Sequence, residues 1–162
     1  MNKTVLKAIN DQINAEMFSS YLYLSMAAWF ETQNLPGMAK WMYAQSHEET
    51  SHAMKFFHFL VERGEAVELK AIDQPKLTFD SALAVFEESL AHEKLITSLL
   101  TKLYELAQAE KDHTTAFLLQ WYLNEQVEEE ANVTKAVEML KMTEGKGYQL
   151  MFLDSKFGAR GG

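Results

Sequence analysis

The feature of this sequence that most limits its fold is the near absence of residues that interrupt helices. Between Thr4 and Lys141, the prolines and glycines are only Pro36, Gly37, Gly64 and Pro75. Because proline and glycine are the strongest local breakers of regular structure, segments this long without them favour long helices over short strands. The sequence therefore predicts an all-α protein.

Four long segments have the apolar spacing of helices with one buried face. We expect them at about residues 4–33, 38–63, 79–111 and 114–142, with Thr4 as the first N-cap. The short breaks at 34–37 and 112–113 imply two antiparallel hairpins. The polar stretch at 65–78 is long enough to cross the bundle, because about 15 extended residues reach roughly 50 Å. A short amphipathic fifth helix follows at about 147–157, then a flexible tail at 158–162.

Composition narrows the class of protein. A chain of 162 residues is most simply one domain, here 1–162, with a substantial core. Its net charge of −8 and lack of a basic cluster argue against a nucleic-acid partner. The absence of cysteine excludes disulfides and thiolate metal sites. Neither a signal-like segment nor an apolar run of membrane-spanning length is visible, so no membrane association and a cytoplasmic location are the expectations.

Each of the four long segments has a carboxylate in its apolar stripe, close to its midpoint. These residues are Glu16, Glu49, Glu93 and Glu129. Glu125 lies on the same stripe as Glu129, with Gln126 and Glu128 on its two borders. At a rise of about 1.5 Å per residue, the inward acids of all four helices fall in one layer. A single acidic run is usually a solvated helix face, but acids from four helices at one depth predict a buried polar layer.

Several buried, ionised carboxylates cost many kcal/mol unless cations compensate them. No Lys or Arg lies in the middle of any stripe, so a bound metal ion is the expected compensation. Glu49 and His52 are one helical turn apart and can bind one ion together with Glu16, while Glu93 and Glu129 can form a second site. Oxygen ligands with one imidazole suit iron or manganese better than copper.

Several segments in order resemble the non-haem bacterial ferritins: "NAEMFSSYLYLSM", "HEETSH", "EKLIT" and "FLLQWYLNEQVEEE". The resemblance covers essentially the whole chain. It implies a ferritin-like four-helix bundle with a long crossover and a fifth helix. It also implies a ferroxidase that oxidises Fe(II) with O₂ or peroxide and stores ferric mineral in a hollow shell of twenty-four subunits. The fifth helix would close that shell at its four-fold axes.

The resemblance also implies roles for individual residues, with two to three iron ions per subunit. Glu16, Glu49 and His52 would hold the first iron, with Glu49 bridging to a second iron held by Glu93 and Glu129. Gln126 would lie beside the second site. A third, transit-type site would use Glu48, Glu125, Glu128 and Glu129. Tyr23 matches the redox-active tyrosine of the family and Trp121 a nearby aromatic residue, although core packing alone also explains both.

Departures from related families exclude further cofactors. Thr50 stands where the haem-binding branch has methionine, and Glu129 where that branch has histidine, so we expect no haem. The remaining histidines, which lie off the inward stripes, are expected at the surface: His47, His58, His92 and His113. Three apolar residues off the stripes are candidates for subunit contacts: Leu35, Val127 and Val133.

Two other functions fit the same pattern. One is a soluble di-iron oxidase or peroxidase that does not store iron, although no electron-transfer domain accompanies the bundle. The other is a catalytically silent subunit that serves only in assembly, although its ligand set is intact. A storage protein accumulates iron, whereas the oxidase or peroxidase does not. A ferroxidase oxidises iron, whereas the silent subunit does not.

Overall fold

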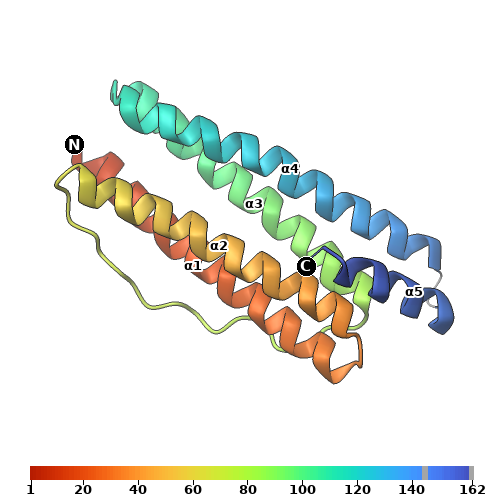
Figure 1. The fold of residues 1–162 in the computed structure, drawn as a ribbon. Helices are drawn as coiled ribbons and strands as arrows, with labels where there is room; N and C mark the ends of the chain where they lie inside the picture. Colours follow the sequence, from red (N-terminus) through yellow and green to blue (C-terminus); the bar gives the residue numbers. More distant parts are fainter. Residues whose placement is uncertain (144–145, 161–162) are drawn as a thin grey trace.

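The computed structural model describes residues 1–143 and 146–160. Within these ranges it contains no strand and five α-helices: α1 (Lys3–Thr32), α2 (Pro36–Glu62), α3 (Ala82–Ala109), α4 (His113–Thr143) and α5 (Gly147–Gly158). The first four form an elongated bundle, and α5 lies across one end of it (Figure 1). The predicted all-α architecture, a four-helix bundle with a long crossover and a short fifth helix, is confirmed.

Side-chain caps set the starts of α1 and α3, which differ by a few residues from the predicted starts. Asn2, not Thr4, caps α1, since its Oδ1 accepts hydrogen bonds from the backbone N–H groups of Thr4 and Val5. Ser81 caps α3 by accepting from the N–H of Ala84 at 3.0 Å, so this helix starts later than Phe79. A side-chain oxygen at the N-cap satisfies an N–H group that would otherwise have no partner in the helix.

The first three helices end in the same way, with one residue in the left-handed region. Asn34, Gly64 and Lys111 have φ of 58°, 72° and 58°. In each case the next N–H bonds back to a carbonyl in the last helical turn, as in Glu65 to Leu60 at 2.9 Å. Only one of the three is glycine, the residue that adopts this conformation without strain.

The connection between α2 and α3 runs along the whole length of α1 without regular structure (Figure 1). Polar side chains of α1 hold it in place. The Nδ2 of Asn10 donates to the carbonyl of Ala66 at 3.2 Å, and the Nδ2 of Asn14 donates to Ala71 at 3.1 Å. Further along, the hydroxyl of Ser25 donates to Lys76 at 2.6 Å. Side chains of α1 therefore bind several carbonyl groups of the crossover backbone. The crossover also allows α3 to start beside the beginning of α2.

The fifth helix is anchored by contacts with the first turn of α2. The carboxylate of Asp154 accepts from the N–H groups of Gly37 and Met38 at 3.1 and 2.8 Å, and so caps α2 from the far end of the sequence. A Cβ on Gly37 would lie 1.8 Å from the carbonyl oxygen of Asp154, so only glycine permits this approach. The predicted tail is in contact with α2 through Arg160, and its last residues, 161–162, lie outside the described residues.

The apolar core has two halves with a polar layer between them. One half includes Tyr23, Met38, Phe86 and Val137, and the other includes Ile9, Phe56, Leu100 and Leu119. In every long helix the residues between these halves include a buried glutamate. Two of the residues predicted to contact other subunits belong to the core instead, since Leu35 and Val133 are buried, whereas Val127 is 69% exposed. Val133 lies one turn after the buried Glu129, so it shares the inward face of α4, although the sequence analysis placed it off the stripe.

Candidate metal centre

The polar layer contains the four glutamates that helical spacing predicted to face inward. Glu16, Glu49, Glu93 and Glu129 come from four different helices, and none is more than 3% exposed. His52, one turn after Glu49, is 3% exposed. These side chains are therefore removed from water and must be compensated within the protein or by a bound ion.

Their ligand atoms fall into three groups, in each of which the atoms lie within 4.8 Å of one another. The first group is Glu16, Glu49 and His52, and the second is Glu49, Glu93 and Glu129. The third, which we call the outer group, is Glu48, His52, Glu125 and Glu129. Because Glu49 belongs to the first two groups, it stands in a bridging position. Glu129 joins the second group to the outer one, and the groups therefore form a connected series.

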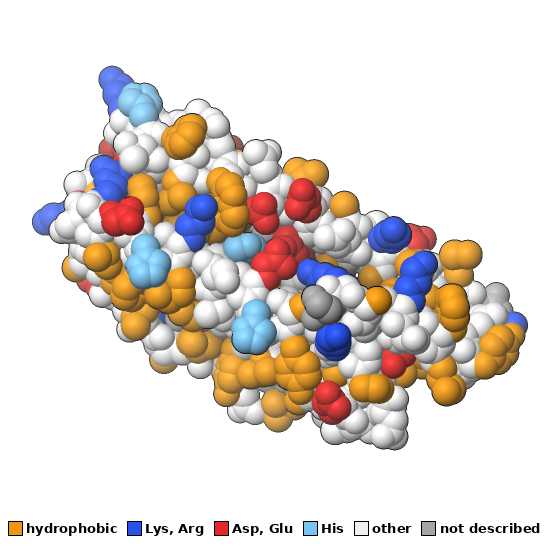
Figure 2. Space-filling view, in the orientation of Figure 1, with side chains coloured by type: hydrophobic (Ala, Val, Ile, Leu, Met, Phe, Trp, Pro, Cys, Tyr) orange, Lys and Arg blue, Asp and Glu red, His pale blue; other side chains and the backbone are white. Residues whose placement is uncertain are grey.

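The outer group differs in one residue from the predicted third site. Glu128 is exposed and does not belong to the group, whereas His52 does. Glu48 and Glu125 are only half-buried, so this group lies closer to the surface than the other two. Figure 2 shows acidic side chains gathered near the middle of this face, with Lys or Arg atoms beside them.

Two buried glutamines orient the glutamates, and the sequence analysis assigned no role to either. The Nε2 of Gln12 donates to Glu16 at 3.0 Å. The Nε2 of Gln45 donates to Glu129 at 2.6 Å and to Glu49 at 3.2 Å. Each glutamine precedes a glutamate of its own helix by four residues, so the two lie on the same face. The repeated spacing, in "QINAE" and "QSHEE", was the signal in the sequence.

Glu93 is held by donors from two other helices. The hydroxyl of Tyr23, which is fully buried, donates to Glu93 and contacts the hydroxyl of Ser89 at 2.9 Å. The Nε2 of Gln126 donates to Glu93 at 3.1 Å. Burial, and then the nearby charge of Glu93, raise the pKa of Tyr23 well above its usual value. Tyr23 therefore remains a neutral hydrogen-bond donor.

Burial dominates the electrostatics of the layer. It raises the pKa of Glu16, Glu49 and Glu93, and like-charged neighbours raise the pKa of the first two further. Burial, followed by repulsion from Glu48, raises the pKa of Glu129 to about 9. Raised pKa values are expected for buried carboxyls that have no positive charge close enough to compensate them. Glu16 Oε2 is a buried oxygen to which no described residue donates a hydrogen bond, so its lone pairs fit a cation.

Aromatic side chains enclose His52 on the side of α4. The rings of Trp121 and Tyr122 lie edge-on to it, with centroids 5.6 and 6.0 Å away. The Tyr122 hydroxyl donates to the backbone carbonyl of His52 at 2.6 Å. Trp121 is 38% exposed, and its outer face carries the ammonium group of Lys55, 3.8 Å from the ring centroid. Trp121 therefore separates His52 from solvent.

His92 was expected at the surface, and the structure places it among side chains of α1 instead. Its Nε2 lies 2.6 Å from the hydroxyl of Ser19, and its ring lies edge-on to Tyr23 at 6.4 Å. Burial lowers the pKa of His92 to about 4. Its position follows from Glu93: since Glu93 points into the layer, the preceding residue faces the α1–α3 contact.

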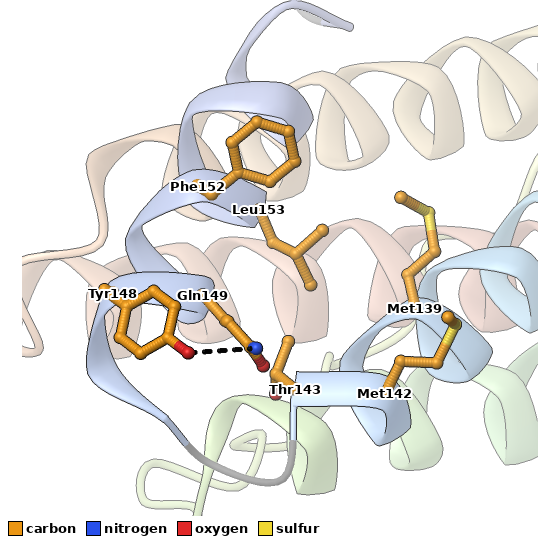
Figure 3. Close-up of a pocket in the computed structure, with 7 residues that line it drawn as sticks. All are labelled: Met139, Met142, Thr143, Tyr148, Gln149, Phe152 and Leu153. Carbon is orange, nitrogen blue, oxygen red and sulfur yellow. Dashed lines mark hydrogen bonds between the residues drawn. The ribbon is translucent and has the colours of Figure 1, made fainter.

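A hollow lined mostly by apolar side chains lies where α4 meets α5. A cavity of about 460 Å³ is lined by the end of α4 and by α5. Figure 3 shows Met139 and Met142 on one side, Leu153 and Phe152 on the other, and a hydrogen bond of 3.4 Å between Gln149 and Tyr148. Among the described residues, its lining contains no carboxylate or imidazole and none of the residues of the three ligand groups.

Known proteins resemble this chain in sequence and in fold. The family model for the ferritin-like domain matches residues 6–143. The bacterial non-heme ferritin of Campylobacter jejuni is 39% identical over 154 residues, which cover 95% of this chain and 92% of that protein. The corresponding protein of Staphylococcus aureus is 34% identical over 160 residues, which cover 99% and 96%.

Solved structures agree with these relatives. An open pore ferritin from the archaeon Archaeoglobus fulgidus superposes with a TM-score of 0.96 at 44% identity, over 98% of both chains. A structure described as a humanized archaeal ferritin also gives 0.96, at 43% identity, over 98% of this chain and 96% of the other. Taken with the family match, this similarity means that the chain belongs to the ferritin family.

Proposed function

We propose that this chain is a ferroxidase subunit that oxidises Fe(II) and stores the product as ferric mineral in a hollow shell of its own copies. The observation that carries the proposal is the connected series of three ligand groups in a buried layer. Membership of the ferritin family supports it independently. Residues 1–162 would act as one domain.

The first two groups are the proposed oxidation centre. Glu16, Glu49 and His52 would bind one Fe(II), and Glu93 and Glu129 a second, with the carboxylate of Glu49 shared between them. Gln126 would act by orienting Glu93, since its amide donates to that carboxylate. The outer group would hold a third ion in transit, with Glu48, Glu125 and Glu129 as ligands and Glu128 at its edge.

The reaction follows from having two metal ions side by side. Two Fe(II) ions lose two electrons, which with two protons reduce O₂ to hydrogen peroxide, or reduce hydrogen peroxide to two molecules of water. The carboxylates stabilise the higher charge of Fe(III) better than that of Fe(II), because hard oxygen ligands favour the harder ion. Tyr23 would keep Glu93 oriented while the charge changes.

Storage requires an enclosed volume, which a single bundle does not have. We propose a shell of twenty-four subunits, closed by α5 at its four-fold axes. The relatives with solved structures are themselves described as ferritins, one of them with an open pore. None of the described helices is long and apolar enough to span a membrane. The cytoplasm is the proposed location.

Aerobic addition of Fe(II) to the metal-free protein tests the oxidation centre. Glu49→Ala and His52→Ala each remove a ligand, and each should slow the rise in ferric absorbance by more than about tenfold. Glu62→Ala is the matched control, because Glu62 is an exposed acid on the same helix. Unchanged rates in both ligand variants would disprove the assigned centre.

A further inference from the structure

The turn after α5 brings a cation to the edge of the carboxylate layer. The Nη2 of Arg160 donates to Gln45 Oε1 at 2.8 Å and to Glu48 Oε2 at 3.3 Å. Its guanidinium carbon lies 4.1 Å from the centroid of the Trp41 ring. Figure 1 shows this end of the chain turned back from the end of the bundle toward its middle. Neither the periodicity of the helices nor the metal-site pattern accounts for this cation.

The position of Arg160 follows from a firmly packed helix. Leu153 and Phe157 of α5 are buried in the core. A Cβ on Gly158 would lie 2.9 Å from the Cα of Gly37, so the two backbones are in contact two residues before Arg160. With Asp154 capping α2, these contacts fix the backbone of Arg160 beside α2, within reach of Gln45 and Glu48.

Arg160 also determines which way the amide of Gln45 faces. Gln45 is fully buried, and its Oε1 accepts from the guanidinium group. Its Nε2 must then face Glu129 and Glu49, to which it donates. The reversed amide would direct its N–H groups at the guanidinium group, which has only donors, and the contact would be lost. The contact with Gln45 therefore fixes the guanidinium group beside the layer.

The second contact of Arg160 involves a member of the outer group. Glu48 Oε2 pairs with the guanidinium group, while Glu48 also belongs to the group formed with His52, Glu125 and Glu129. A metal ion in that group would need the same carboxylate that the guanidinium group binds. The first and second groups contain no residue that is ion-paired to an arginine or lysine in the described chain.

We propose that Arg160 competes with divalent cations for the carboxylate of Glu48 in the outer group. Ion pairing with Glu48 weakens metal binding there and leaves the two inner groups the preferred sites. A cation then occupies the outer group only when it displaces the guanidinium group from Glu48. This role rests on the proposed function, because it assigns an order of filling to the same three groups.

Zinc titration of the assembled, metal-free protein by calorimetry tests the proposal without any oxidation. Arg160→Gln should tighten the weakest class of zinc sites about fivefold, the effect expected for a half-exposed ion pair. In a Glu48→Gln background the same substitution should have no effect on zinc affinity, because the ion pair is already absent. Lys156→Gln is the matched control, since it removes a positive charge from an exposed position on α5.

Each outcome has a defined meaning. An Arg160→Gln isotherm identical to that of the parent overturns the proposal, and so does tightening that persists in the Glu48→Gln background. Arg160→Lys, which keeps the charge, should bind zinc much as the parent does. If Arg160→Gln does not assemble, Arg160→Met takes its place, since it keeps most of the apolar stem against Trp41 and removes the charge; zinc affinity equal to that of the parent then overturns the proposal. A parent protein that binds no zinc at the three groups would contradict the proposed function itself.

Discussion

Each buried glutamate of the proposed metal centre accepts a hydrogen bond from at least one neutral donor that holds it in place. Gln12 and Gln45 act from one turn earlier on the same helix, whereas Tyr23 acts across the bundle on Glu93. Removing such a donor leaves the ligand present but less well positioned. Substitutions at these residues should therefore change metal affinity without removing a ligand.

Tyr23→Phe removes one donor and almost no volume. The hydrogen bond from Tyr23 lowers the pKa of Glu93, so its loss should raise that pKa further and favour the protonated carboxyl. We expect zinc affinity at the second group to fall by about tenfold, as is typical when an outer partner of a ligand is lost. Calorimetric titration measures this. Tyr43→Phe, on the exposed side of α2, is the control, and equal affinities in parent and Tyr23→Phe would show that the hydrogen bond contributes nothing.

The raised pKa of Glu129 predicts that metal binding releases protons. The value of about 9 lies well above the ordinary 4.5, so near neutral pH the folded, metal-free protein keeps this proton. A bound cation must displace it. Titrations with zinc at pH 7 in two buffers of different ionisation enthalpy should therefore show proton release, and Glu129→Gln should release fewer protons. The same heat in both buffers would contradict the expectation.

The same shift sets how stability depends on pH in the metal-free protein. Between about pH 4.5 and 9 the unfolded chain has lost the proton of Glu129 while the folded chain retains it. The stability that the raised pKa of Glu129 contributes to the folded protein is fully present below about pH 4.5. It is lost as the pH rises to about 9. The free energy of unfolding should therefore decrease from acidic to alkaline pH, and zinc should reverse the decrease. Urea unfolding at several pH values measures it.

At the scale of helices, the left-handed residue that ends α3 is a lysine. Non-glycine residues lose about 1 kcal/mol or more in this conformation, because Cβ approaches the backbone. Lys111→Gly should therefore stabilise the protein by about 1 kcal/mol. Lys102→Gly, in the exposed interior of the same helix, should destabilise it by about the same amount. Denaturant unfolding measures both, and a loss of stability in Lys111→Gly would refute the argument.

Helix spacing predicted the long elements and the depth of the four buried glutamates, because both depend on local periodicity. The predicted starts of the first and third helices, at Thr4 and Phe79, were wrong by a few residues. A helix begins where a capping side chain reaches its free N–H groups, and periodicity does not show which residue does so. The contact of Arg160 could not be predicted. It requires α5 to dock on α2, and Gln45 and Arg160 are 115 residues apart in the chain.

At the scale of the whole molecule, oxidation and storage have different requirements. The ligand groups lie within one bundle, so each subunit carries a full set. An enclosed mineral, in contrast, needs many subunits. The exposed apolar residues of the α4–α5 end are candidates for the contacts between them, and they are Met142, Tyr148, Met151 and Phe152. Apolar groups this exposed on neighbouring turns favour a partner surface.

Phe152→Glu should therefore separate the two activities. Phe152 is 70% exposed and borders the cavity between α4 and α5, so a carboxylate there leaves the bundle folded but opposes an apolar contact between subunits. Gel filtration should show smaller particles, and iron retained per protein should fall sharply. The first, stoichiometric phase of Fe(II) oxidation should persist, because the ligands of each subunit are intact. Ser155→Glu adds the same charge at an exposed position of α5 without removing an aromatic ring and should assemble. A Phe152→Glu protein that forms full-sized, iron-filled particles would exclude this end of the bundle from the contacts that close the shell.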